Sequence, residues 1–217
     1  MRPERVHLLH ISKTGGTALR YALSPVADAN GISLHGHKMV LRDVPEDEGV
    51  FFFVRQPASR FVSGFNSRLR MGQPRRDVPW NDKEAAAFAR FSTPNQLAEA
   101  LDSEDADERR AAFRAMKGVG HLRMPYSGWL EGEAYLESRR ASIVLVGRTE
   151  RMQDDFERLK QRLRLPASLA LPDDPIRAHV TPSGFSTTLS DRGRRNVDTW
   201  YRRDVALWTY LVEHFAD

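Results

Sequence analysis

The chain contains no cysteine among its 217 residues. Disulfide bonds, a thiolate nucleophile and cysteine-ligated metal sites are therefore excluded. Long hydrophobic runs are lacking as well, and the opening Met-Arg-Pro-Glu-Arg leads into an apolar segment too short for a signal peptide or a membrane span. These absences predict a protein without a membrane span that works in a reducing compartment, the cytoplasm.

A large charge of one sign is missing too. The 33 Lys and Arg residues exceed the 29 Asp and Glu residues by only four. This excess suits an anionic ligand but is too small to indicate a nucleic-acid partner. The apolar fraction of 41% is ordinary for a soluble protein, and the length suits one α/β domain. We therefore predict a single domain over residues 1–217.

The residues that are present predict an anion site near the N-terminus. An apolar run at Val6–Ile11 indicates a strand, a glycine pair follows, and helix-forming residues occupy 17–23. A helix that begins at such a turn directs backbone N–H groups at an anion. The turn is not a Walker A loop, because its lysine precedes the glycines. The predicted anion-binding residues are Lys13, Thr14, Gly15, Gly16, Thr17 and Ala18.

A second segment repeats this architecture. The apolar run Val50–Val54 predicts a buried strand, and Pro57 suits the start of a helix. Arg55 falls at the carboxyl end of the strand, where open α/β sheets bind ligands, and Ser63 lies on the helix. Two anion sites at two strand ends suggest a ligand with separate anionic groups.

The two segments resemble the PAPS-dependent sulfotransferases. Residues 13–18, Lys-Thr-Gly-Gly-Thr-Ala, are similar to the 5′-phosphosulfate loop of that family, and residues 55–63, Arg-Gln-Pro-Ala-Ser-Arg-Phe-Val-Ser, are similar to its 3′-phosphate motif. Residues 145–152 resemble the family segment beside the adenine. The C-terminal stretch 180–210 resembles the lid and last helix of the carbohydrate-type, sulfotransferase family 2-like, branch. Ser12 and Gln56 depart from the usual Pro and Asp or Asn.

The resemblance implies a P-loop-like, three-layer α/β fold whose central, mainly parallel sheet is flanked by helices. It also implies that PAPS (3′-phosphoadenosine 5′-phosphosulfate) donates a sulfuryl group to an acceptor hydroxyl, expected on a carbohydrate, and that no metal is needed. Lys13 would stabilise the leaving phosphate, the glycine turn would hold the 5′-phosphate, and Arg55 and Ser63 would hold the 3′-phosphate.

Two further pairs of residues are assigned to the nucleotide by the resemblance. Arg148 and Thr149, at a predicted strand end, would contact the adenine, although Thr149 could instead cap the helix that follows. Thr181 and Ser183 would close over the nucleotide from a lid at 166–190.

The general base is sought in the segment His35-Gly36-His37. Carbohydrate-type members carry a similar Gly-His, which matches Gly36-His37, and a neutral imidazole suits proton abstraction near pH 7. His37 is therefore the first candidate and His35 the second, with His179 of the lid as a further residue near the ligand. The same histidine pair could bind a metal, but no cysteine or ordered carboxylate set accompanies it, so we predict no metal site.

Two other functions remain open. A P-loop kinase would explain the phosphate loop, but the position of Lys13 and the lack of a strand ending in Asp disfavour it. A catalytically silent nucleotide-binding module is disfavoured by the retained Lys13, Arg55 and Ser63. Eukaryotic carbohydrate sulfotransferases are typically Golgi membrane proteins, so the missing anchor predicts a bacterial, cytoplasmic enzyme, unless an anchor has been removed.

The remaining elements follow from periodicity and breakers. A short strand or loop is predicted at 34–41, and Pro and Gly residues predict a loop at 72–82. The predicted helices cover 57–71, 83–91, 94–101, 106–116 and 152–163, a further strand covers 142–146, and a last helix begins at 190 or 191.

Overall fold

The fold is built on a four-stranded sheet in which every strand runs parallel to its neighbours. The computed structural model describes residues 4–174 and 181–216. The strand order is β2-β1-β3-β4, and Leu8 of β1 lies opposite Leu34 of β2 and Phe51 of β3. The strands are β1 (Val6–Leu9), β2 (Ile32–Leu34), β3 (Gly49–Val54) and β4 (Ile143–Arg148). The predicted α/β class is confirmed.

Contacts divide the chain into two units. The first unit comprises Met1–Arg55, Tyr126–His179 and Ala206–Asp217, and it contains the whole sheet. The second unit comprises Gln56–Pro125 and Val180–Val205, and it is helical.

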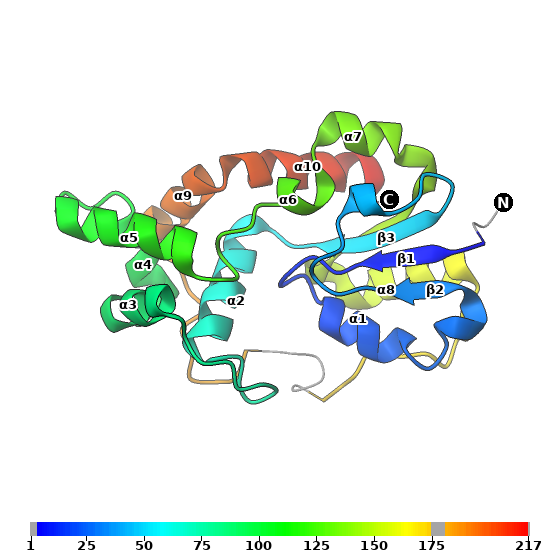
Figure 1. Ribbon diagram of the computed structural model, residues 1–217, viewed down its shortest axis with the longest axis horizontal. Coiled ribbons are helices and arrows are strands. Elements are labelled where there is room, and N and C mark those ends of the chain that lie inside the picture. Colours follow the sequence, from blue (N-terminus) through cyan, green and yellow to red (C-terminus); the bar gives the residue numbers. More distant parts are fainter. Residues whose placement is uncertain (1–3, 175–180, 217) are drawn as a thin grey trace. The chain divides into compact units, whose positions relative to one another are not determined.

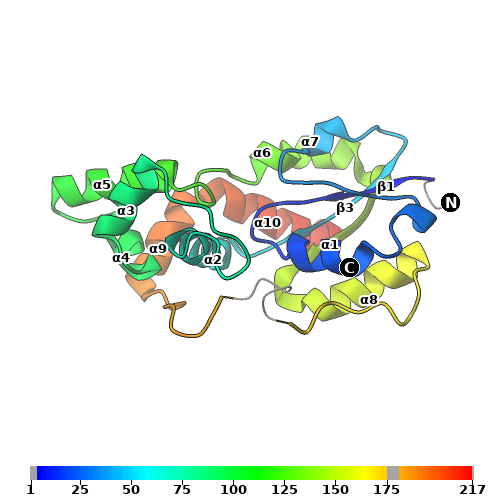
Figure 2. The same ribbon diagram turned by 60° about the horizontal axis from the view of Figure 1, so that its bottom comes forward.

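Helices cover both faces of the sheet in the first unit (Figures 1 and 2). On one face lie α1 (Gly16–Leu23) and α8 (Met152–Leu163). On the other lie α6 (Ser127–Leu130), α7 (Glu133–Ser138) and residues 206–215 of α10 (Arg202–Phe215). The buried side chains between the sheet and the first pair of helices include Val6, Leu8, Leu19, Ala22, Phe51, Phe53, Leu145, Phe156 and Leu159. These three layers match the predicted architecture.

The sequence of the central strand β3 is apolar without alternation because both faces of the strand are covered. Its residues Gly-Val-Phe-Phe-Phe-Val are all buried. Successive side chains of a strand point to opposite faces, so Phe51 and Phe53 pack toward α1 and α8 while Phe52 points the other way. A strand covered on both sides has no polar face to present, which is typical of parallel sheets.

The second unit is a group of helices that begin at clear capping residues. Gln56 accepts a hydrogen bond from the Ser59 amide at the start of α2, and Thr93 accepts one from the Gln96 amide at the start of α4. The helices are α2 (Pro57–Leu69), α3 (Asp82–Arg90), α4 (Pro94–Ala100), α5 (Ala106–Gly118) and α9 (Asp191–Trp200). Their core includes Phe61, Phe65, Phe88, Leu97, Met116 and Val197.

Several element bounds differ from the prediction. The strand expected within 34–41 lies at Ile32–Leu34, the short helices α6 and α7 were not predicted, and the last helix is divided at Tyr201 into α9 and α10 (Arg202–Phe215). Short 3₁₀ turns occupy Asp28–Asn30, Leu41–Asp43, Arg140–Ser142 and Thr149–Arg151.

Of the expected lid, residues 166–174 and 181–190 contain no helix or strand, and the remainder, which includes His179, lies outside the described residues. Among the helices that the structure describes, none is long and apolar enough to cross a membrane.

Candidate functional site at the carboxyl ends of the strands

Residues predicted for function follow all four strands at one edge of the sheet. The Lys13 turn follows β1, His35 and His37 follow β2, Arg55 follows β3, and Thr149 follows β4. The chain leaves β1 toward β2 on one side and leaves β3 toward β4 on the other. Neighbouring strands whose connections diverge in this way form a switch point, and open α/β sheets bind ligands in the crevice outside such strand ends.

The turn after β1 has the geometry of an anion cradle. Lys13 and Gly15 both adopt left-handed backbone angles, with φ of 68° and 83°. Lys13, Gly15 and Thr17 are partly exposed, whereas Thr14, Gly16 and Ala18 are buried. Gly15 is the N-cap of α1 and, as a glycine, contributes no side-chain cap. The N-terminus of the helix, where the helix dipole favours a negatively charged group, therefore lies at this turn.

Thr14 stabilises this turn rather than presenting its hydroxyl to solvent. Its side chain is only 1% exposed and donates a hydrogen bond to the Ile11 carbonyl over 2.9 Å. Any contribution of Thr14 to anion binding would come from its backbone. Gly16 is required for a different reason, because a Cβ atom there would lie 2.1 Å from Cδ2 of the buried His10 ring.

The Gly16→Ala variant is expected to be less stable than the wild type. The added methyl group must displace His10, and overpacking of this kind costs about 1–3 kcal/mol. For a chain of this length each kcal/mol corresponds to roughly 2–4 °C in Tm, which thermal unfolding measures. Gly36→Ala is the matched control, because no atom lies within 4 Å of a Cβ built there. Equal Tm changes in the two variants would contradict the close approach of His10.

Arg55 is held by its backbone at the end of β3. The Arg55 amide donates to the hydroxyl of Tyr126 over 2.9 Å, and that hydroxyl donates back to the Arg55 carbonyl. Tyr126 itself is fully buried. These two hydrogen bonds fix the backbone position from which the Arg55 side chain extends.

The charge around Arg55 favours an additional anion. Burial lowers the pKa of the Arg55 guanidinium, and the nearby Glu150 carboxylate and Tyr126 only partly oppose this effect. Burial disfavours the charged form of a group, whereas a nearby anion favours it. A phosphate beside Arg55 would therefore stabilise its charged guanidinium.

The hydrogen bonds of His37 suit a general base. Its Nδ1 lies 2.9 Å from the His10 carbonyl, which can only accept, so Nδ1 carries the proton and Nε2 of the neutral ring carries the lone pair. The His10 ring packs against the His37 ring with centroids 4.0 Å apart. The indole Nε1 of Trp129 donates to the His37 carbonyl over 3.1 Å and anchors the backbone. His37 is exposed.

His35 belongs to a chain of hydrogen-bonded side chains. Its Nε2 lies 2.7 Å from Nδ1 of His7, and Nε2 of His7 contacts the Glu48 carboxylate. His7 is buried. Burial lowers the pKa of His35, and the nearby His7 and Arg20 charges lower it further. His35 is therefore neutral near pH 7 and is connected to a carboxylate through one imidazole.

At the end of β4, Arg148 and Thr149 make contacts that organise the sheet edge. The Thr149 hydroxyl donates to the Val54 carbonyl over 3.1 Å and joins the ends of β3 and β4. The Arg148 amide donates to the fully buried carboxylate of Asp155 over 2.7 Å, and its side chain approaches the same oxygen at 3.5 Å. The capping role considered for Thr149 is replaced by this bond to β3.

The remaining predicted site residues lie elsewhere in the chain. Ser63 is buried on α2, and Thr181 and Ser183 lie in the segment that precedes α9, so all three belong to the second unit. His179 lies outside the described residues. In the part of the chain that the structure describes, no three His, Asp or Glu side chains gather as a metal site would require.

Sequence reasoning did not find Tyr126, Trp129, His7 or Glu48 as supporting residues of this site. His7 lies opposite Ser33 of β2, a pairing that no local pattern of the sequence predicts. Tyr126, Trp129 and Glu48 gave no signal in the sequence either. No protein-family model and no curated protein matches the chain.

Proposed function

We propose that this protein is a sulfotransferase that moves a sulfuryl group from PAPS to an acceptor hydroxyl, with a carbohydrate as the expected acceptor. The observation that carries the proposal is the switch point, where a glycine turn, a partly buried arginine and a histidine of defined tautomer follow β1, β3 and β2. A ligand with two anionic groups and a reacting centre requires such a combination.

The residues of the first unit support a donor with two phosphate groups. The start of α1 and the backbone of the Lys13 turn suit the 5′-phosphate. Arg55 suits the 3′-phosphate, because burial disfavours the charge of its guanidinium and a phosphate would stabilise that charge. Ser63 is proposed as a second ligand of the 3′-phosphate on the sequence motif alone. Thr181, Ser183, Arg148 and Thr149 are retained as proposed nucleotide contacts on the same ground.

His37 is proposed to act on the acceptor hydroxyl, and Lys13 is proposed to act on the phosphate that leaves. PAPS, when bound, supplies the sulfuryl group and the phosphate that leaves. His37 Nε2 accepts the proton of the acceptor hydroxyl as that oxygen forms its bond to sulfur. The ammonium group of Lys13 stabilises the negative charge that develops on the phosphate oxygen when its bond to sulfur breaks.

The test is a comparison of nucleotides on the wild type and on Arg55→Ala. We expect 3′-phosphoadenosine 5′-phosphate to raise the wild-type Tm more than ATP with Mg²⁺ does. Arg55→Ala should weaken that nucleotide by about 10–150-fold, since a charged hydrogen bond contributes roughly 1.5–3 kcal/mol, and should leave adenosine 5′-phosphate almost unchanged. Thermal shift and calorimetric titration measure both effects.

Arg151→Ala serves as the matched control, because this exposed arginine pairs with Asp154 on the surface. A preference for ATP with Mg²⁺ would support a kinase instead, and indifference to both nucleotides would support a module without this chemistry. Equal losses for the two adenosine nucleotides in Arg55→Ala would assign Arg55 to the fold or to the 5′-phosphate.

A further inference from the structure

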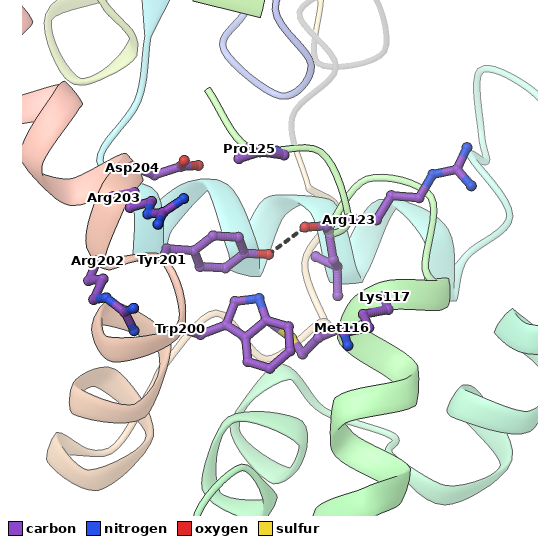
Figure 3. Close-up of a pocket in the computed structure, with 10 residues that line it drawn as sticks. Met116, Lys117, Arg123, Pro125, Trp200, Tyr201, Arg202, Arg203 and Asp204 are labelled. Carbon is purple, nitrogen blue, oxygen red and sulfur yellow. Dashed lines mark hydrogen bonds between the residues drawn. The ribbon is translucent and has the colours of Figure 1, made fainter. Parts of the chain in front are cut away.

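The second unit contains a pocket that the proposed transfer does not use. Its volume of about 370 Å³ falls within the ~300–1,000 Å³ of typical ligand sites. The lining comes from the end of α5, the segment 122–125 and the junction of α9 with α10, all within the second unit (Figure 3).

The wall of the pocket is aromatic and fixed in place. The Trp200 ring makes an edge contact with the Phe113 ring, with centroids 5.0 Å apart and planes at 86°. The Tyr201 side chain is buried, and its hydroxyl donates to the Leu122 carbonyl over 2.7 Å (Figure 3). Burial raises the pKa of Tyr201 well above its usual range, so the hydroxyl keeps its proton. Trp200 is partly exposed and offers a flat apolar face.

Four cationic side chains surround this wall. Figure 3 shows Arg202 and Arg203 on one side of Trp200, and Lys117 and Arg123 on the other. All four are exposed, and none of them pairs with a carboxylate among the residues that the structure describes. Unlike the surface arginines that pair with nearby acids, they leave a concentrated positive charge around the pocket.

The single acid in the lining does not offset this charge. Asp204 is buried and lies 3.2 Å from Nη1 of Arg60, whose Nη2 donates to the Met124 carbonyl over 2.6 Å. The buried charges of Asp204 and Arg60 neutralise one another. The charge that faces an entering ligand is therefore that of the four exposed cations.

We propose that this pocket binds a small organic polyanion whose ring packs on Trp200. Guanidinium groups bind sulfate, phosphate and carboxylate through paired hydrogen bonds, and they are more weakly hydrated than ammonium groups. An indole face adds contact with a sugar or base ring. Two or more anionic groups on one ring would engage cations on both sides of Trp200. An acidic saccharide and a nucleotide share this chemistry, and the experiment distinguishes the two sources.

The experiment is calorimetric titration at low ionic strength with a trisulfated disaccharide and with uridine 5′-triphosphate. The unsulfated disaccharide and uridine keep the ring and remove the charge, whereas inorganic triphosphate keeps the charge and removes the ring. Wild-type protein should bind at least one charged ring compound more tightly than its uncharged counterpart. The charged compound that binds more tightly shows whether the ligand is an acidic saccharide or a nucleotide.

Two double variants locate the binding. Arg202→Ala with Arg203→Ala should weaken the charged ring compound by about tenfold or more, as expected when charged hydrogen bonds are lost. The matched control, Arg194→Ala with Arg195→Ala, removes the same charge from exposed positions of α9 outside the lining. It should change the affinity much less, because neither Arg194 nor Arg195 lines the pocket. Trp200→Leu should weaken the ring compounds and leave inorganic triphosphate unchanged.

Three results would overturn the proposal: no binding of either charged compound to the wild type, equal losses in the two double variants, or equal affinity for charged and uncharged compounds. The inference does not depend on sulfuryl transfer. Binding of 3′-phosphoadenosine 5′-phosphate that is sensitive to Arg55→Ala can be present or absent whatever the pocket does, so the two proposals can fail separately.

Discussion

Replacing Lys13 with alanine is expected to lower kcat by about 10²–10³-fold, the usual cost of removing one donor that stabilises a developing negative charge. The reason is its place in the turn after β1, where the residue adopts a left-handed backbone and is partly exposed at the switch point. The affinity for 3′-phosphoadenosine 5′-phosphate should fall much less, because the turn backbone and Arg55 remain. Steady-state kinetics and calorimetry separate the two quantities.

Two variants control for the loss of a charge. Arg42→Ala removes an exposed cation of the first unit that pairs with Glu131, and its kcat should match the wild type. Lys13→Arg keeps the charge and should recover part of the lost rate. A Lys13→Ala protein that folds with the wild-type Tm and keeps its kcat would remove Lys13 from the mechanism.

The second large effect is expected from His37→Ala, which should lower turnover by about 10²–10⁴-fold, the range for loss of a general base. Binding of 3′-phosphoadenosine 5′-phosphate should not change, because the base acts on the acceptor. The bond from Nδ1 to the His10 carbonyl keeps the lone pair on Nε2, and the alanine variant removes that lone pair. His214→Ala is the matched control, since its Nδ1 also bonds a backbone carbonyl, that of Tyr210.

The pH dependence distinguishes His37 from His35. A base acts when neutral, so kcat/KM falls as the pH drops through its pKa. Because burial and the neighbouring His7 and Arg20 lower the pKa of His35, an acidic limb set by His35 would lie below about 6.5, the ordinary value for histidine. If His35→Ala abolishes that limb and the turnover while His37→Ala retains both, His35 is the base. If both variants remain active, His179 becomes the next candidate.

The central strand of the sheet was predictable because it is apolar on both sides. The run Val50–Val54 contains no polar residue, so it fits a strand covered by helices and little else. The extent of β2 was not predictable, since Ile32–Leu34 pairs with β1 over three residues only and gives little pattern to detect. The break at Tyr201 was missed for a related reason: the apolar stripe continues across it.

The sequence predicted where the candidate site lies. It did not predict the residues that hold the site in place. Lys13, His37 and Arg55 each lie within four residues of the end of a strand, and parallel strands bring such positions to one edge. Tyr126, by contrast, lies 71 residues from the Arg55 backbone that it holds, and Glu48 reaches His7 across 41 residues. Pairings of this kind depend on tertiary packing, which local patterns do not encode.

The burial of β3 also affects how the protein behaves before it folds. Gly-Val-Phe-Phe-Phe-Val is uncharged, contains no proline and favours β-structure, the composition of segments that assemble into aggregates when exposed. Charges at Glu46, Asp47 and Glu48 precede it, and Arg55 and Pro57 follow it, in the places where natural sequences put residues that discourage such assembly. Glu48, which contacts His7, and Arg55, the proposed phosphate ligand, both flank this strand. We therefore expect substitutions at either residue to affect the solubility of the nascent chain as well as the candidate site.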